Sequence, residues 1–229
     1  MCAVAIVASS WLCISAQNLD VSGRIEATHQ SKRAPHASLG DVVVWLTPLQ
    51  MQPEGTVRRS QEYTLTQKDK MFHPHLLVVP VGSNVNFPNL DPFFHNVFSL
   101  FNGKRFDLGL YEAHTHRSVL FDREGVSYIF CNIHPNMGAV IVSLSTPYYG
   151  VSKADGSIVV HDVPPGRYRL SVWGENVGVE RLAELSRVVE IGPESTDLGV
   201  FRLEFSGDVM NHHQNKFGES YPPTVKQPY

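Results

Sequence analysis

The chain is poor in cysteine. It has three cysteines in 229 residues, and two of them, Cys2 and Cys13, lie within the first 16 residues. Residues 1–16 carry no charged side chain and combine apolar blocks with small residues at their end, which is typical of a cleaved secretory signal peptide. The expected mature chain then has Cys131 alone, and a lone cysteine forms no internal disulfide. Cys131 is therefore either a buried inert thiol or a ligand.

An excess of charge of either sign is also missing. The 19 Lys and Arg residues nearly balance the 22 Asp and Glu residues, for a formal net charge of −3. No basic stripe or polybasic run is present, which argues against a nucleic-acid partner and an anionic membrane partner. The N-terminal apolar stretch is shorter than the roughly 20 residues of a membrane span. We expect a periplasmic protein with no membrane span in its mature chain.

The chain also lacks long segments with helical periodicity. The chain contains 17 Gly and 15 Pro and many β-branched and aromatic residues, which favour strands and turns. The expected fold class is all-β. The expected strands are Val21–Ile25, Asp41–Thr47, Tyr63–Thr66, Leu76–Val81, Asn84–Phe87, Phe94–Phe101, Arg117–Asp122, Val126–Phe130, Ala139–Leu144, Ser157–His161, Arg167–Val172, Arg187–Ile191 and Asp197–Phe205.

Against this background, one short stretch offers three metal-binding side chains at even spacing. Cys131, His134 and Met137 lie three residues apart, between two strand-like runs. A tight loop between strands can direct all three side chains at one centre. Sulfur together with imidazole nitrogen is a soft ligand set that selects copper. A second imidazole completes a trigonal site with a weak axial thioether, and His95, at the end of another apolar run, is well placed to supply it.

At these residues the chain resembles the cupredoxins, the small blue-copper proteins, with a ligand loop of the amicyanin type. The resemblance covers roughly residues 60–146. It implies a Greek-key β-sandwich that binds one copper ion, Cu(I) or Cu(II), through His95, the Cys131 thiolate, His134 and an axial Met137. It also implies that Asn96 hydrogen-bonds to the cysteine loop and directs its amide at the sulfur.

The whole chain resembles bacterial proteins of the methylamine-utilisation or plastocyanin-like type, which join a cupredoxin to a carboxypeptidase-regulatory-like β-sandwich. We expect residues 18–59 and 147–206 to form this second sandwich, interrupted by the cupredoxin domain at 60–146. Residues 100–112 are expected to be irregular, residues 180–185 to form one helical turn, and residues 207–229 to form a disordered tail.

The resemblance implies a periplasmic electron carrier, not an enzyme, that acts as a monomer with a redox protein partner whose identity the sequence does not give. Pro92, Phe93 and Pro135 are candidates for an apolar docking patch around His134. Two alternatives stay open: a copper carrier or storage protein, and a non-redox binding module. A copper enzyme would need a second metal centre, and no second Cys-His cluster is present in the sequence.

Three pairs of histidines lie outside this expected ligand set. His73 and His75 flank a proline, His114 and His116 could share one face of a strand, and His212 and His213 lie in the tail. Each group could bind a second metal ion, because histidine is the commonest metal ligand. Surface or structural roles are the usual ones for such residues. The sequence leaves open whether His114 and His116 bind metal.

Overall fold

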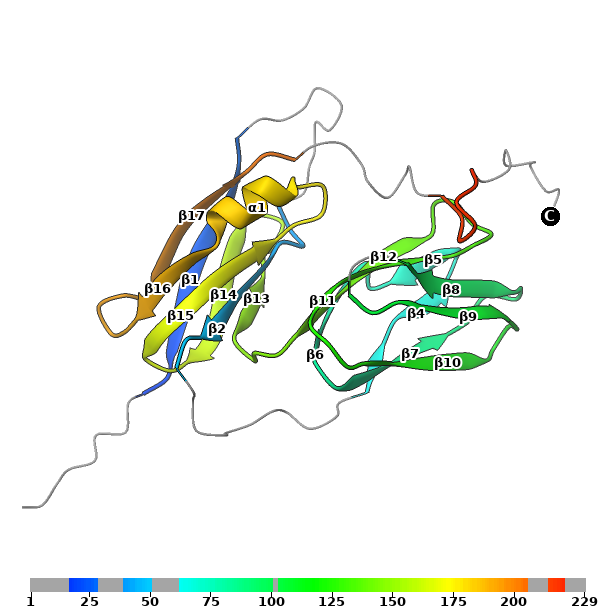
Figure 1. Cartoon of the computed structure of the whole chain (residues 1–229), viewed down its shortest axis with the longest axis horizontal. Coiled ribbons are helices and arrows are strands. Elements are labelled where there is room, and N and C mark those ends of the chain that lie inside the picture. The colour runs from blue at the N-terminus through cyan, green and yellow to red at the C-terminus, as the bar shows by residue number, and fades with distance from the viewer. Residues whose placement is uncertain (1–16, 29–38, 51–61, 101–102, 206–213, 221–229) are drawn as a thin grey trace, which may run out of the picture.

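The structure is a computed structural model that describes residues 17–28, 39–50, 62–100, 103–205 and 214–220 (Figure 1). The predicted signal peptide and most of the predicted tail lie outside the described residues. The fold is all-β, as predicted, and its strands form two packed β-sandwiches. The single helix of the described residues, α1 (Val179–Leu185), is short. No helix among the described residues is long and apolar enough to cross a membrane.

The first sandwich carries the predicted metal ligands. Its five-stranded sheet has the order β6 (Leu76–Pro80), β12 (Gly138–Leu144), β11 (Gly125–Phe130), β8 (His95–Ser99) and β9 (Phe106–Tyr111). The facing sheet has the order β10 (His116–Phe121), β7 (Ser83–Pro88) and β3 (Tyr63–Thr64). A hairpin of β4 (Thr66–Lys68) and β5 (Met71–His73) closes one end.

Alternating side chains of these strands fill the core between the two sheets. Along β11 and into the loop, Ile129 and Cys131 enter this core, and along β12 Ala139 and Ile141 enter it. The remaining buried members of the core are Leu65, Phe72, Val79, Val85, Phe87, Val97, Tyr111, Val119, Phe121 and Met137. The metal-ligand candidates Cys131 and Met137 are therefore part of the hydrophobic core and held by its packing.

The second sandwich draws strands from both ends of the chain. One sheet has the order β14 (Ser157–Val163), β1 (Leu19–Ala27) and β17 (Asp197–Leu203). The other has the order β13 (Tyr149–Val151), β2 (Val43–Pro48), β15 (Gly166–Trp173) and β16 (Arg187–Ile191). Strand β2 pairs with β13 and β15, which both follow the first sandwich in the sequence. The first sandwich thus interrupts the run of strands that builds the second.

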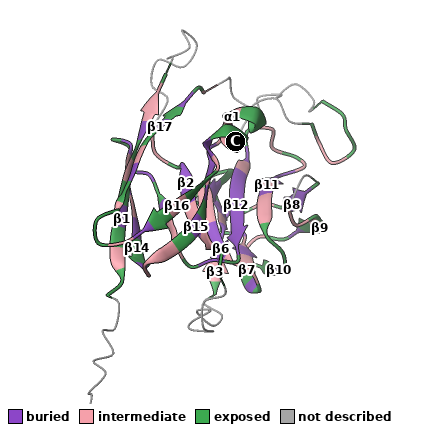
Figure 2. Cartoon of the chain, turned by 60° about the vertical axis from the view of Figure 1, so that its left-hand side comes forward, coloured by how far each residue is buried: buried purple, intermediate pink, exposed green. Residues whose placement is uncertain are grey.

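Two strands are buried on both faces, and they mark where the sandwiches meet. Val140 and Val142 on β12 and Val43 on β2 face away from their own sandwich cores into a shared hydrophobic cluster. The ring of Tyr128 meets the ring of Trp173 across this cluster, with centroids 6.4 Å apart. Burial on both faces explains why β12 is almost continuously apolar in sequence, and Figure 2 shows it buried along its length.

The sequence-based expectations were wrong in three places. Residues 106–111, expected to be irregular, form β9, whose pairing with β8 contains a register shift next to Gly109 at φ 66°. The short strands β5 and β13 were not expected. Residues 214–220, expected to be disordered, form a hydrogen-bonded turn against the first sandwich.

Candidate metal centre

The loop from Cys131 to Met137 joins β11 to β12 and closes on itself. The Cys131 N–H donates to the Met137 carbonyl at 3.1 Å, and the Met137 N–H donates to the His134 carbonyl at 3.2 Å. Both bonds run inside the loop, so its ends stay one strand spacing apart. The predicted short loop between two strands is therefore present, and it turns Cys131 and His134 towards the same point.

The structure brings His95, Cys131 and His134 together. Cys131 Sγ lies 3.7 Å from His95 Nδ1 and 3.5 Å from His134 Nδ1, and the three donor atoms lie within 4.8 Å of one another. Bonds of about 2.0 Å from a metal to nitrogen and about 2.3 Å to sulfur, at trigonal to tetrahedral angles, separate the two donors by about 3.5–3.7 Å. The two sulfur–nitrogen distances therefore match those expected around a single ion, and the ligand atoms of the two imidazoles lie within 4.8 Å of the thiol and of each other.

Met137 lies in the same loop and the same core. Its side chain is fully buried and belongs to the cluster that contains Cys131. The backbone bond from Cys131 to Met137 fixes these two residues opposite each other at the loop ends. Met137 thus shares the buried core with Cys131, and its role as a fourth ligand stays a prediction.

Cys131 is buried in a weakly polar environment. Burial raises the pKa of its thiol, and hydrogen bonds from the backbone N–H groups of Asn96, Ile133 and His134 partly offset this effect. The same N–H groups are suited to a thiolate, because hydrogen bonds to the charged form stabilise it. A bound cation would displace the thiol proton and leave a sulfur that already has its donors in place.

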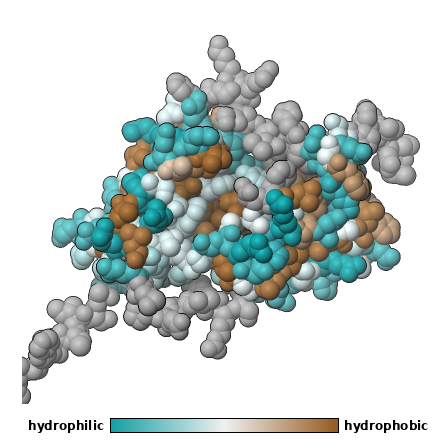
Figure 3. Space-filling view, viewed as in Figure 1, coloured by the Kyte–Doolittle hydropathy of each residue, from teal (hydrophilic) through white to brown (hydrophobic). Residues whose placement is uncertain are grey.

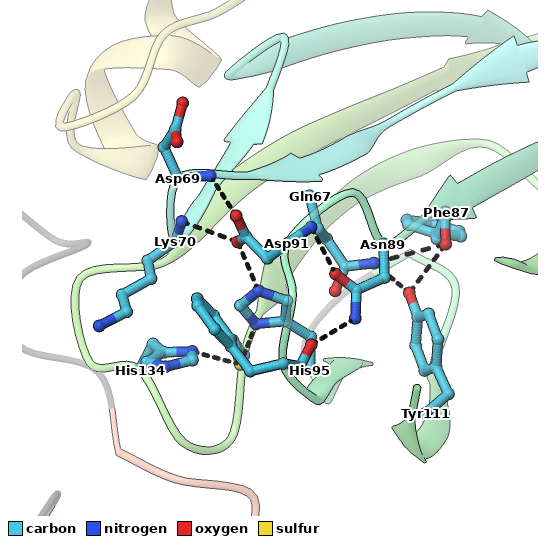
Figure 4. Close-up of polar contacts among 11 residues, drawn as sticks. Gln67, Asp69, Lys70, Phe87, Asn89, Asp91, His95, Tyr111 and His134 are labelled. Atoms are coloured by element: carbon cyan, nitrogen blue, oxygen red, sulfur yellow. Dashed lines mark hydrogen bonds and ion pairs between the residues drawn. The ribbon is translucent and has the colours of Figure 1, made fainter. Parts of the chain in front are cut away.

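The far nitrogen of His95 has a carboxylate partner that the sequence analysis missed. His95 Nε2 lies 2.7 Å from Asp91 Oδ2, and both residues are buried (Figure 4). Asp91 also accepts hydrogen bonds from the backbone N–H groups of Asp69, at 2.7 Å, and Lys70, at 3.0 Å. Such a carboxylate fixes the ring orientation and leaves Nδ1 directed at the metal. The sequence did contain a signal for this contact, because Asp91 lies four positions before the predicted ligand His95.

Burial and the neighbouring Asp91 together determine whether the His95 imidazole is protonated. Burial lowers the pKa of His95, and the hydrogen bond and charge of Asp91 oppose this effect without cancelling it. Burial also acts to raise the pKa of Asp91, yet hydrogen bonds from Lys70, His95 and Asp69 hold that pKa below its usual value. Near neutral pH the histidine is therefore neutral, the form that binds a metal ion.

His134 lies at the accessible edge of the centre. Burial, together with the nearby His95 and Lys70, lowers its pKa to about 4. The ring of Phe93 packs against both His95 and His134, with centroids 5.2 and 5.8 Å away. Pro92 is exposed and Pro135 is half-buried.

Asn96 sits where the sequence predicted it, with different side-chain contacts. Its backbone N–H hydrogen-bonds to Cys131, while its side-chain Nδ2 donates to Asp107 Oδ1 on β9 at 2.8 Å instead of bonding to the cysteine loop. Its Oδ1 is buried without a partner. The predicted link from this residue to the sulfur is thus made by the backbone.

The remaining histidines do not form a second cluster in the part of the chain that the structure describes. The single group of three or more metal-binding side chains found there is His95, Cys131 and His134. His114 precedes β10 with φ 59°, and His116 begins it, so the two do not share a strand face. His75 instead pairs with Glu175 at 2.6 Å. His212 and His213 lie outside the described residues.

Searches against known proteins give similarities to solved structures alone. No protein-family model and no curated protein sequence matches the chain. A copper-containing nitrite reductase from Thermus scotoductus SA-01 is 23% identical with a TM-score of 0.36, over 38% of this chain and 23% of that one, so the chain spans under a quarter of its length. A purple cupredoxin from Nitrosopumilus maritimus is 22% identical (TM-score 0.32; 36% and 98% covered). An oxidised mutant of amicyanin is 19% identical (TM-score 0.34; 36% and 81% covered).

Proposed function

We propose that this protein binds one copper ion through His95, Cys131, His134 and Met137 and carries single electrons between redox partners. The observation that carries the proposal is the convergence within 4.8 Å of the Cys131 thiol and the His134 imidazole, from a loop that also carries the buried Met137 thioether, with the His95 imidazole from β8. Two nitrogens, one thiolate and a weak axial sulfur form the ligand set of electron-transfer copper. The bound ion would supply a one-electron Cu(I)/Cu(II) couple.

The protein's own residues support such a couple by resisting rearrangement. Asp91 holds the His95 ring, and the Asn96 N–H is directed at the sulfur. The loop hydrogen bonds hold Cys131 and Met137 in the rigid core. Ligands that are already in place need little movement when the charge of the ion changes, which favours electron transfer over substrate chemistry.

Electrons would enter and leave at the His134 edge. The residues flanking the two ligand histidines are apolar and accessible: Ile133 is 45% exposed and Phe94 is 52% exposed. Figure 3 shows hydrophobic residues at the surface of the first sandwich, among hydrophilic ones. A small apolar surface suffices for a redox partner, because such encounters are weak and bury little area.

Three further parts of the proposal extend beyond the site. We propose export to the periplasm after removal of residues 1–16, and a monomeric mature chain. We also propose a domain division with a cupredoxin domain at 60–146 inserted into a carboxypeptidase-regulatory-like sandwich of residues 18–59 and 147–206. The pairing of β2 with β13 and β15 supports this division.

An absorption spectrum of the purified protein with one equivalent of Cu(II) tests the proposal. We expect an intense band near ~600 nm from the thiolate-bound cupric ion, which disappears on addition of a mild reductant and returns on reoxidation. The Cys131→Ser variant should lack the band, and a His116→Gln variant, changed at an exposed histidine outside the cluster, should keep it. A colourless wild-type protein would favour a non-redox binding module. A band that does not return on reoxidation, after a chelator has withdrawn Cu(I) from the reduced protein, would favour a copper carrier.

A further inference from the structure

The C-terminal segment 214–220 lies against the sandwich that carries the metal centre. The last strand, β17, belongs to the other sandwich, yet residues 214–220 (red in Figure 1) lie beside the first sandwich. The chain therefore returns to the metal centre after completing the second sandwich.

This segment is a compact turn built around Asn215. The Asn215 side-chain oxygen accepts hydrogen bonds from the N–H groups of Phe217 and Glu219, each at 2.9 Å. The Gly218 N–H donates to the Asn215 carbonyl, and the Asn215 N–H donates to the Glu219 carbonyl, also at 2.9 Å each. The turn fixes the backbone of Lys216 at its centre, so that Lys216 can bind through its main chain and its side chain together.

Lys216 uses both groups to contact the metal-binding sandwich. Its backbone N–H donates to Asn132 Oδ1 at 2.9 Å, and its Nζ lies 2.7 Å from Asp107 Oδ2. The ion pair is partly shielded, with 24% of the Lys216 side chain and 36% of the Asp107 side chain exposed. One residue thus joins the ligand loop to strand β9.

Each of the two contacted residues is next to a segment whose backbone N–H groups bond to the Cys131 sulfur. Asn132 directly follows Cys131 and precedes Ile133 and His134, whose N–H groups bond to the sulfur. Asp107 accepts the side-chain amide of Asn96, whose backbone N–H also bonds to the sulfur. Lys216 therefore braces both backbone segments that supply hydrogen bonds to Cys131.

We propose that Lys216 is a positioning residue of the metal centre, which holds Asn132 and Asp107 so that three backbone N–H groups stay directed at Cys131 Sγ. As far as copper is concerned, this proposal rests on the proposed function. Hydrogen bonds to the cysteine sulfur tune the reduction potential of such a site. The C-terminal turn thus sets the potential without contacting the ion.

The first test uses the metal-free full-length protein and does not depend on copper. Hydrogen exchange of the Asn96, Ile133 and His134 amides, the three that are directed at the sulfur, is measured by NMR in the wild-type, Lys216→Met and Lys216→Arg proteins. We expect exchange about tenfold faster in Lys216→Met, as for loss of a charge-assisted hydrogen bond. Both variants keep the backbone donor to Asn132, and Lys216→Arg also keeps the positive charge beside Asp107, so it should restore most of the protection. Unchanged exchange in Lys216→Met would overturn the proposal.

The second test measures the reduction potential of the copper-loaded proteins. Lys216→Met should lower it, because loosened N–H groups and a lost positive charge both disfavour the reduced form. Lys70→Met is the matched control for charge, because Lys70 lies over Phe93 beside the centre and contacts neither Asn132 nor Asp107. It should lower the potential without accelerating exchange. Lys104→Met breaks an ion pair with Asp122 and should change neither quantity.

The outcomes separate the two proposals. Faster exchange in Lys216→Met in a protein that never binds copper would leave Lys216 as a brace of the loop and refute the proposed copper function. Faster exchange with a potential that shifts no more than in Lys70→Met, the control for lost charge, would refute the positioning role at the metal centre.

Discussion

At the scale of single residues, the centre depends on side chains of two kinds. Cys131, His95 and His134 offer the donor atoms, and their type and spacing could be read from the sequence. Asp91 and Asn96 position those donors, and their contacts could not be read in the same way. Asp91 lies in a proline-flanked loop, where its partners depend on how the β4–β5 hairpin approaches it in space.

Asp91 provides the first prediction. Replacing it by Asn leaves a side chain of the same size that has lost its charge, so the His95 ring is oriented less firmly. We expect metal affinity to fall by about 10- to 100-fold. Competition with a coloured chelator measures the affinity, and Asp122→Asn, at an exposed ion pair away from the centre, should leave it unchanged. Equal affinity of Asp91→Asn and wild type would show that the carboxylate does not support the ligand.

The lowered pKa of His134 predicts how the metal-free protein responds to acid. Between pH ~6.5, the usual histidine value, and the folded-state pKa of about 4, the unfolded chain binds a proton that the folded chain does not. The free energy of unfolding therefore decreases as pH falls through this window. Urea unfolding at several pH values should show a weaker dependence in His134→Gln. An identical dependence in both proteins would contradict the assigned pKa.

At the scale of elements, the strands beside the centre were predictable and several of the joining segments were not. Strands β11 and β12 were expected because their sequences are mostly apolar, and β12 is buried on both faces. Strand β9 was missed because Gly109 adopts φ 66° and the ladder to β8 slips by a residue, which obscures the alternation. The turn at 214–220 was missed because the contacts that hold it against the first sandwich come from Asn132 and Asp107, far away in sequence.

The β4–β5 hairpin carries an element-scale prediction. Its turn residues Asp69 and Lys70 have φ of 57° and 58°, and both direct their N–H groups at Asp91. Lys70→Pro removes one donor and imposes a negative φ, so it should weaken metal binding. Lys70→Gly keeps the donor and favours positive φ, so it should preserve binding. Chelator competition on both variants distinguishes backbone positioning from a role of the lysine side chain, which both variants lack.

At the scale of the whole molecule, the two sandwiches share a hydrophobic interface next to the loop from Cys131 to Met137. Val140 and Val142 on β12, which begins directly after Met137, pack with Val43 and Trp173 of the other sandwich. His75 adds a polar contact, because its ring pairs with Glu175 at 2.6 Å and its carbonyl accepts from Val140 N–H at 2.8 Å. The second sandwich therefore supports the sheet from which the ligand loop emerges.

The His75–Glu175 pair makes this interface sensitive to pH. The hydrogen bond to Glu175 raises the pKa of His75 above its usual value, against the opposing effect of burial. Protonated His75 therefore stabilises the folded state fully below pH ~6.5, and this contribution is lost as pH rises through the raised pKa. It should stay within about 1 kcal/mol, because the His75 side chain is 45% exposed and solvent screens the pair.

NMR titration of the His75 ring measures this pKa directly. In Glu175→Gln the pKa should return towards the ordinary histidine value, and the stability gained below neutral pH should shrink accordingly. Glu184→Gln, at an exposed pair with Arg181 on α1, provides a matched control that should leave the titration of His75 unchanged. A His75 pKa that is the same in Glu175→Gln and wild type would mean that the pair does not persist in solution.

The measurement that tests the central claim most directly is the copper X-ray absorption spectrum of the loaded protein, compared between wild type and Cys131→Ser. The account predicts one short copper–sulfur bond and two imidazole nitrogens in the wild type, with the short sulfur bond absent from the variant. A wild-type spectrum without a short sulfur bond, or one that the Cys131→Ser substitution leaves unchanged, would contradict it.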